Sequence, residues 1–232
     1  MGVYYMNGYG VEPDESAAYK CFLKATEKGD IMATDALATC CFNGYGVEKN
    51  LSDAYKYYTI AAERGYTKSQ VTIGNMYSKG TGVERDSEKA YYWYNLAAEQ
   101  GEPSALYRVA EYYSAQDSLG GKKALKKSSA FDYYKRAAEG GNAQAQLYLS
   151  RCYQTGRYVK KNKKEAFQWA LRAADGGLVQ AQEYVANCYL KGRGVSKNPF
   201  FAYEWYKKAA AQGSKVATER TTEYETFRQF VY

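Results

Sequence analysis

The chain has 232 residues, of which 46% are hydrophobic, and it carries a formal net charge of +7. It contains no histidine, which excludes Ser–His and Cys–His catalytic triads and histidine metal ligands. It has no run of about 18 apolar residues, so no transmembrane helix is predicted, and residues 1–10 lack the pattern of a signal peptide.

Glycines recur along the chain at a regular interval. One series is spaced by 36 residues, with a single step of 40, and comprises Gly29, Gly65, Gly101, Gly141, Gly177 and Gly213. Gly-x-Gly-Val segments keep the same interval at 8–11, 44–47, 80–83 and 192–195, with a looser copy at 156–159. A period of about 20–50 residues is typical of stacked repeats rather than of a globule with one cleft. The sequence therefore predicts about six stacked units.

The third unit shows what each repeat contains. Residues 67–79 have apolar side chains at helical spacing. Asp86 or Ser87 is placed to cap a second helix, and Gly101 is placed to end it in the left-handed conformation. Each unit is thus predicted to be a helical hairpin, a helix A followed by a helix B, with no strand.

Small and large residues recur in fixed columns of these hairpins. One column of helix B is always alanine, at Ala18, Ala54, Ala90, Ala130, Ala166 and Ala202. A small-residue column of helix A comprises Ala33, Ser69, Ala105, Ala145, Ala181 and Ala217. Small residues let helix backbones approach each other, and large aromatic residues of the facing helix fill the remaining space. Most of the 27 tyrosines fit this structural role.

The combined pattern identifies a family. A-x-x-x-(I/L/V)-(G/A)-x-x-Y-x-x-G-x-G-V followed by A-x-x-(W/Y)-Y-x-x-A-A-x-x-G, clearest in 67–102 and 179–214, resembles the Sel-one-like repeat (SLR) family, a relative of tetratricopeptide repeats. The resemblance covers essentially the whole chain. It implies an all-α, right-handed α-solenoid of about six 36-residue helix-turn-helix repeats, with helices A lining a concave face. Related arrays act as adaptors in ER-associated degradation, bacterial signalling, envelope assembly and host–microbe contact.

The predicted organisation is a single array over 1–232 with a C-terminal capping helix. Its units are 1–30, 31–66, 67–102, 103–142, 143–178 and 179–214, and the terminal helix is 215–232. The longer fourth unit places its extra residues in the A–B loop. The first unit starts halfway through its helix A, which predicts an exposed apolar end and a longer parent protein. In the terminal helix, Thr221, Thr222 and Glu225 stand in apolar columns, as a polar cap requires.

The cysteines do not form a disulfide or metal framework. Their number is odd and their spacing irregular: Cys21, Cys40, Cys41, Cys152 and Cys188. Equivalent helices pack about 8–10 Å apart, beyond the Cα separation of about 7 Å that a disulfide bridges. No C-x-x-C zinc pair is present. We expect free thiols, which favour a reducing compartment such as the cytoplasm, and neither a metal nor a cofactor.

A partner-binding surface is predicted on the concave face. The candidates are helix A residues expected to project away from the core, a set rich in the Tyr and Arg of binding hot spots. They are Asn75, Tyr107, Arg108, Glu111, Tyr148, Arg151, Tyr184, Asn187 and Lys191. Leu147 is expected to point outward with them. The alternative interpretation is that these residues cover a solvated helix face.

Lysines gather in two successive A–B connections, where stacking would join them into one basic edge. They are Lys122, Lys123, Lys126, Lys127, Lys160, Lys161, Lys163 and Lys164. Residues 1–116 hold 11 basic and 15 acidic residues, net −4, and 117–232 hold 21 and 10, net +11. The edge is either a docking strip for an acidic partner or a solubilising surface. Only Tyr158 lies among the cations, which argues against specific nucleic-acid binding.

These patterns favour a non-catalytic scaffold or adaptor that binds a protein or peptide, rather than an enzyme. Two alternatives remain. One is β-lactam or peptidoglycan-related binding or hydrolysis, which has been linked to cysteine-rich relatives, although the chain lacks S-x-x-K and K-T-G elements. The other is an electrostatic docking module for an anionic membrane or nucleic acid.

Overall fold

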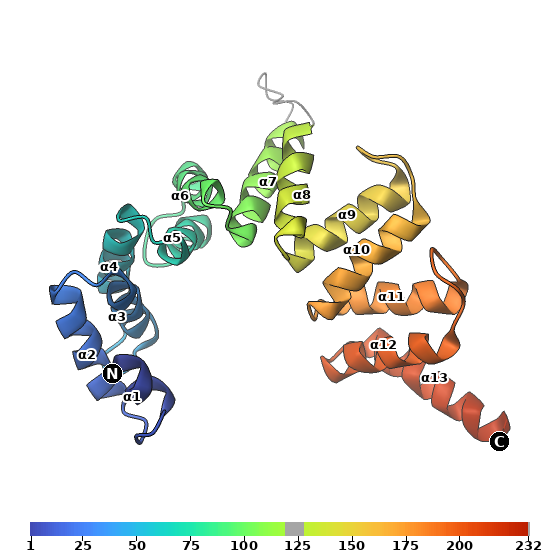
Figure 1. The fold of residues 1–232 in the computed structure, drawn as a ribbon, viewed down its shortest axis with the longest axis horizontal. Coiled ribbons are helices and arrows are strands. Elements are labelled where there is room, and N and C mark those ends of the chain that lie inside the picture. Colours follow the sequence, from blue (N-terminus) through green and yellow to red (C-terminus); the bar gives the residue numbers. More distant parts are fainter. Residues whose placement is uncertain (119–127, 232) are drawn as a thin grey trace. The chain divides into compact units, whose positions relative to one another are not determined.

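The computed structural model describes the backbone of residues 1–118 and 128–231 and the side chains of 1–115 and 130–226. Within these residues all regular secondary structure is α-helical (Figure 1). Helices A are α1 Gly2–Asn7, α3 Ile31–Asn43, α5 Thr67–Lys79, α7 Pro103–Ser118, α9 Ala143–Thr155, α11 Val179–Lys191 and the terminal α13 Lys215–Val231. Helices B are α2 Glu15–Glu27, α4 Leu51–Glu63, α6 Ser87–Glu99, α8 Ser128–Glu139, α10 Lys163–Asp175 and α12 Pro199–Ala211.

The chain forms two compact units, Met1–Val109 and Ala110–Tyr232. In the first, each helix from α1 to α6 packs against the next one in the chain. In the second, the same holds from α8 to α13. The predicted all-α repeat solenoid is confirmed, and helix α5 coincides with the predicted range 67–79. The predicted Lys122, Lys123, Lys126 and Lys127 lie outside the described residues.

Side-chain caps fix where helices B begin. Asp86, the N-cap of α6, accepts hydrogen bonds from the backbone N–H groups of Glu88 and Lys89, both at 3.0 Å. The predicted cap at Asp86 is therefore confirmed, because it satisfies donors that a helix start leaves unpaired. Other helices B begin in the same way after Asp14, Asn50, Asn162 and Asn198. At the other end, Gly101 follows the C-cap of α6 with φ of +83°, as predicted.

The small-residue columns form the core. The alanine column of helices B is at most 4% exposed throughout, and that of helices A at most 8%. Tyr94 of α6 shows the size complementarity: it is 5% exposed, and a Cβ added to Gly74 would lie 2.6 Å from its ring. A close approach of this kind is what small residues permit.

The second glycine of three Gly-x-Gly-Val segments, at Gly46, Gly82 and Gly194, permits contact between neighbouring repeats. A Cβ on Gly194 would overlap the backbone carbonyl of Lys163, at the start of the preceding helix B. Tyr158 holds this column in the fifth repeat and adopts φ of +65° without being glycine. Its ring lies 5.5 Å from that of Phe131 and 4.9 Å from the guanidinium of Arg157.

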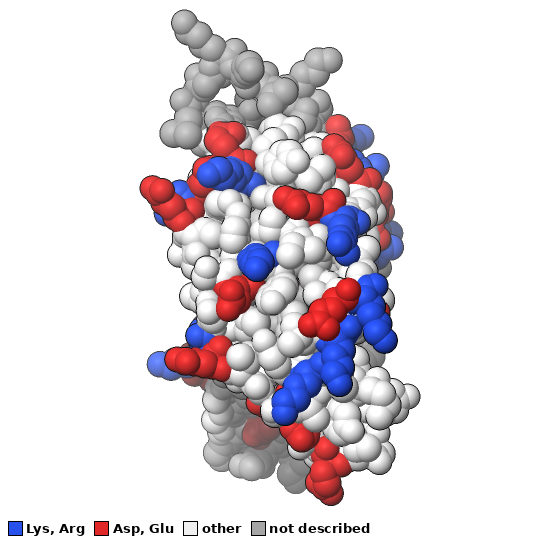
Figure 2. All heavy atoms as spheres, turned by 90° about the vertical axis from the view of Figure 1, so that its left-hand side faces the viewer, with Lys and Arg blue, Asp and Glu red and all other residues white. Residues whose placement is uncertain are grey.

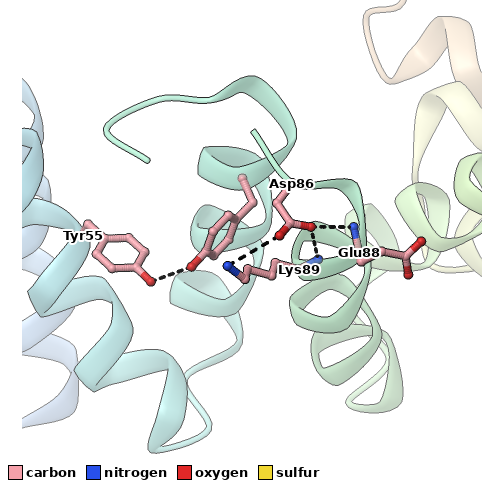
Figure 3. Close-up of polar contacts among 5 residues, drawn as sticks. Tyr55, Asp86, Glu88 and Lys89 are labelled. Carbon is pink, nitrogen blue, oxygen red and sulfur yellow. Dashed lines mark hydrogen bonds and ion pairs between the residues drawn. The ribbon is translucent and has the colours of Figure 1, made fainter. Parts of the chain in front are cut away.

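Aromatic side chains join several helices B to the next helix A. Tyr55 of α4 and Tyr77 of α5 share a hydrogen bond of 2.7 Å between their hydroxyl groups (Figure 3). Burial and this bond raise the pKa of Tyr77 to about 12. At the last such junction, the Tyr203 hydroxyl donates to the carboxylate of Glu225 in α13 at 2.6 Å. The Glu225 carboxylate thus gives a hydrogen-bond partner to Tyr203, the last residue of this aromatic column.

Glutamines join neighbouring repeats at the other end of the hairpins. Gln182, 4% exposed, donates from Nε2 to the carbonyl of Ala174 at 3.3 Å, in the last turn of α10. Gln212 donates to Gln182 Oε1 at 2.9 Å and to the Gly177 carbonyl at 3.1 Å. The Ala174 carbonyl also accepts from the backbone N–H of Gly177 at 3.0 Å, so Gln182 supplies a second donor at this helix end. Gln70 and Gln146 make the equivalent bonds to Ala62 and Ala138.

Replacing Gln182 with alanine should lower the free energy of unfolding by about 1–2 kcal/mol, since the Ala174 carbonyl loses its second donor and a small cavity opens. Replacing the exposed Gln212 with alanine should lower the free energy of unfolding by less than about 1 kcal/mol. In the double variant, the loss in free energy of unfolding should be about 0.5–1 kcal/mol smaller than the sum of the two single losses, as expected for side chains in direct contact. Urea unfolding of the four proteins measures this coupling. Strict additivity would show that the two side chains do not interact.

Candidate interaction surfaces

A groove of about 290 Å³ lies between α9 and α11 in the second unit. It brings together three of the predicted partner-binding residues, Arg151, Tyr184 and Asn187. The other lining residues are Leu147, Gln154, Gln180 and Glu183. Gln154 and Gln180 were missed at the sequence level. They continue the predicted stripes by one helical turn, at spacings of three and four residues, and could have been found that way.

Tyr184 was expected to project away from the core, and this was wrong. Its ring is half-buried and packs against the core cluster that contains Ala170 and Val185. Its hydroxyl hydrogen-bonds the buried thiol of Cys188, one turn further along α11. Burial, reinforced by this bond, raises the pKa of Tyr184. Tyr184 therefore lines the groove and also packs against the core.

The outward orientation predicted for Leu147 and Tyr148 was also wrong. Leu147 is only 5% exposed and belongs to the core of the second unit. The Tyr148 ring stacks on Tyr134 of α8 with centroids 3.8 Å apart, and burial raises its pKa. Both residues lie one position from the core stripe on the helix, where a large apolar side chain turns inward.

The remaining predicted partner-binding residues lie outside this groove. In the first unit, Asn75 accepts a hydrogen bond from the Tyr94 hydroxyl at 2.8 Å. The Arg108 guanidinium lies 5.8 Å from the centroid of the Tyr107 ring. In the second unit, Glu111 is partly exposed on α7 and Lys191 is exposed in the last turn of α11.

The described part of the basic edge lies around the start of α10. Lys160, Lys161, Lys163 and Lys164 are all exposed. The α11–α12 loop packs on this segment, because Gly194 lies against the Lys163 carbonyl. Arg193 is therefore brought next to the lysines of the preceding repeat. This contact explains in physical terms why basic residues one repeat apart join into one surface.

The repeated glycines, alanines and caps match the model of the Sel1 repeat, over residues 1–30, 31–66, 68–102, 103–142, 143–178 and 179–214. This chain belongs to the Sel1 repeat family. It is 30% identical to a Sel1 repeat protein from Oxalobacter formigenes, with a TM-score of 0.82 over 91% of this chain and 85% of that one. No curated protein matches the chain.

A second solved structure is c5321, a protective antigen present in uropathogenic Escherichia coli strains that displays an SLR fold. It is 28% identical, with a TM-score of 0.60, and the match covers 96% of this chain and 55% of that one. Sel1 repeat proteins are generally protein-interaction scaffolds, so protein partners are the class that family membership indicates.

A larger groove of about 790 Å³ lies at the start of the first Sel1 repeat. It is lined mainly by α1, α2 and the beginning of α3, and Met1 and Met32 are 72% and 68% exposed beside it. An exposed apolar surface was predicted at this place.

On the face that Figure 2 draws, acidic and basic side chains are interspersed around uncharged ones, so neither sign of charge covers it.

The thiols and carboxylates of the array are dispersed. All five cysteines are free, and Cys40, Cys41, Cys152 and Cys188 are buried. Among the described residues, no three His, Cys, Asp or Glu side chains gather as a metal site would require. In the same part of the chain, no helix is both long and apolar enough to span a bilayer.

Proposed function

We propose that this Sel1 repeat protein is a non-catalytic scaffold that binds an extended peptide, or the surface of a partner protein, on its helix A face. The observation that carries the proposal is the α9–α11 groove, where Arg151, Tyr184 and Asn187 converge. An exposed guanidinium beside an aromatic ring and amide groups is the combination on which binding hot spots rely.

The groove is pre-organised by contacts behind it. The core and the Cys188 thiol hold Tyr184, and Asn187 Nδ2 donates to the Glu183 carbonyl at 2.9 Å. The Glu183 carboxylate accepts a hydrogen bond from the Ser214 hydroxyl, which ties α11 to the turn before α13. Side chains that are already fixed lose less conformational entropy on binding, which favours affinity.

The chemistry of the lining supports binding rather than catalysis. The one carboxylate among the seven lining residues, that of Glu183, is engaged by Ser214, and the other side chains are Leu, Arg, Gln, Tyr and Asn. These groups supply hydrogen bonds, one positive charge and apolar contact to a ligand. They do not form the nucleophile and base pair of covalent catalysis.

Changing Arg151 and Gln180 to alanine should weaken binding of a partner by at least about tenfold, since both side chains line the groove and lie on its surface. The partner is first recovered by affinity capture from the native lysate and identified by mass spectrometry. Its affinity for purified wild-type and variant protein is then measured by calorimetry.

The matched control replaces Arg172 and Gln168, exposed residues of α10, with alanine and should leave affinity unchanged. Circular dichroism checks that both double variants keep their helicity. Unaltered affinity of the groove variant, with full helicity, would remove the α9–α11 groove from the proposal.

A further inference from the structure

Two phenylalanines are exposed where most other repeats have polar residues. Phe200 and Phe201, in the first turn of α12, are 53% and 47% exposed. In the preceding repeat, Lys164 and Glu165 hold the same positions at the start of α10. The Phe201 ring lies 5.4 Å from Tyr189, while Phe200 contacts the Phe201 ring at 5.9 Å. Apolar rings in the first turn do not stabilise a helix N-terminus, where acidic and capping residues do.

Exposed cations lie on the segments next to these two rings, in the loop before α12 and at the start of α10. The contact of Gly194 with the Lys163 carbonyl joins the loop before α12 to the start of α10. We name the resulting surface the α10–α12 edge, and it consists of Arg157, Lys160, Lys161, Lys163, Lys164, Arg193, Lys197, Phe200 and Phe201. Each of its cations is exposed. None of them is paired with a carboxylate within the described part of the chain.

We propose that the α10–α12 edge docks the protein on an anionic phospholipid surface, a site separate from the helix A groove. The lysines and arginines would lie at the headgroups, and Phe200 and Phe201 would enter the boundary with the acyl chains. Exposed basic residues beside exposed aromatic ones are the combination by which peripheral surfaces bind membranes. Each cation near an anionic leaflet strengthens binding about fivefold.

The position of the aromatic rings favours lipid over the other anionic partners. Binding of single-stranded nucleic acid requires aromatic rings distributed along the cationic track, so that successive bases stack on them. Here the two exposed rings contact each other at one end of the edge. Tyr158, which lies among the cations, has its ring against Phe131 and Arg157. An acidic protein segment would be matched by the charges but would not account for two adjacent exposed phenylalanines.

The test is co-sedimentation of the whole chain with vesicles of phosphatidylcholine alone and with vesicles that also contain phosphatidylserine. Binding should require phosphatidylserine and should weaken as salt rises, because the Debye length falls below about 10 Å above 0.1 M. Changing Lys160, Lys161 and Lys164 to glutamine should weaken binding at least about tenfold. Phe200→Ala should weaken it with no change in charge.

Two matched variants control for net charge and for loss of an aromatic ring. Lys135, Lys207 and Lys215, exposed cations of the same unit outside the edge, are changed together to glutamine, and Tyr92, 57% exposed in the first unit, is changed to alanine. Both should bind vesicles like the wild type. Equal losses in edge and control variants, no sedimentation at low salt, or binding of RNA or polyglutamate without binding of vesicles would each overturn the proposal.

Discussion

Replacing Gly194 with alanine should lower the free energy of unfolding by about 2–5 kcal/mol, a large effect for the addition of a single methyl group. Two costs add. The residue adopts φ of +77°, which costs an L-residue about 1–2 kcal/mol. The new Cβ would also overlap the Lys163 carbonyl and lie 3.2 Å from Phe167 Cβ. Overpacking of this kind costs about 1–3 kcal/mol.

Gly177→Ala separates the two costs. Gly177 has φ of +84°, but a Cβ there would meet nothing within 4 Å. Gly177→Ala should therefore lower the free energy of unfolding only by the cost of a positive φ, about 1–2 kcal/mol. Urea unfolding followed by far-UV circular dichroism measures both variants. Equal losses would show that the repeats do not approach each other closely at Gly194.

The fold was predictable because each local rule is repeated. A single Gly-x-Gly is weak evidence, but a glycine that returns every 36 residues with an alanine and a cap in register indicates one structure only. Asp86 illustrates this: as a cap it was one of two candidates, and the Asp or Asn found before other helices B selects it. Agreement among the glycine spacing, the alanine column and the capping residues, rather than the propensity of any one residue, made the prediction possible.

The groove was less predictable because its shape depends on where individual repeats depart from the pattern. The column that holds Tyr58, Tyr94, Tyr134 and Tyr206 in four helices B holds Ala170 in α10. The smaller residue leaves room in the core, and Tyr184 packs into the cluster that contains it. A helical phase read from sequence does not reveal such compensation between facing helices. Tyr184 was therefore assigned to the right helix and the wrong orientation.

The α10–α12 edge shows the same limit. Its lysines were predicted to gather, but Phe200 and Phe201 were not singled out, because apolar residues near a helix start are usually buried. Their exposure follows from their place in the first turn, ahead of the buried Ala202. The sequence did hold a signal of this exposure, because the preceding repeat has the polar residues Lys164 and Glu165 at the two equivalent positions.

Raising the pH from about 8 to about 12 should destabilise the protein strongly. Burial raises the pKa of the Cys40 thiol to about 11, with smaller contributions from Cys41 and Glu15. The unfolded thiol ionises near its usual pKa, about 8.5–9. Above that pH the unfolded state binds fewer protons than the native state, so the free energy of unfolding falls as the pH rises. Cys40 alone would remove about 3 kcal/mol by the time the pH exceeds its native pKa.

Buried tyrosines extend this loss above pH 10. Burial raises the pKa of Tyr58, Tyr134 and Tyr184, so each stays protonated in the native state after it would ionise in the unfolded chain. Tyr184→Phe removes one such group and keeps the ring. It should cost about 1 kcal/mol at neutral pH through the lost hydrogen bond to Cys188, and that cost should shrink above pH 10.

Denaturant unfolding at a series of pH values gives the free energy of unfolding against pH for the wild type and for Tyr184→Phe, and these two curves are compared. The narrowing of the gap between the two curves at alkaline pH is decisive, because a purely structural defect would lower the stability of Tyr184→Phe by the same amount at every pH. Parallel curves, or a wild-type stability that stays constant from pH 8 to about pH 12, would show that these hydroxyl and thiol groups ionise as readily in the folded protein as in the unfolded one. Loss of stability on the alkaline side would follow from the way this array is built, since tyrosine and cysteine side chains are packed among the alanines of its core clusters.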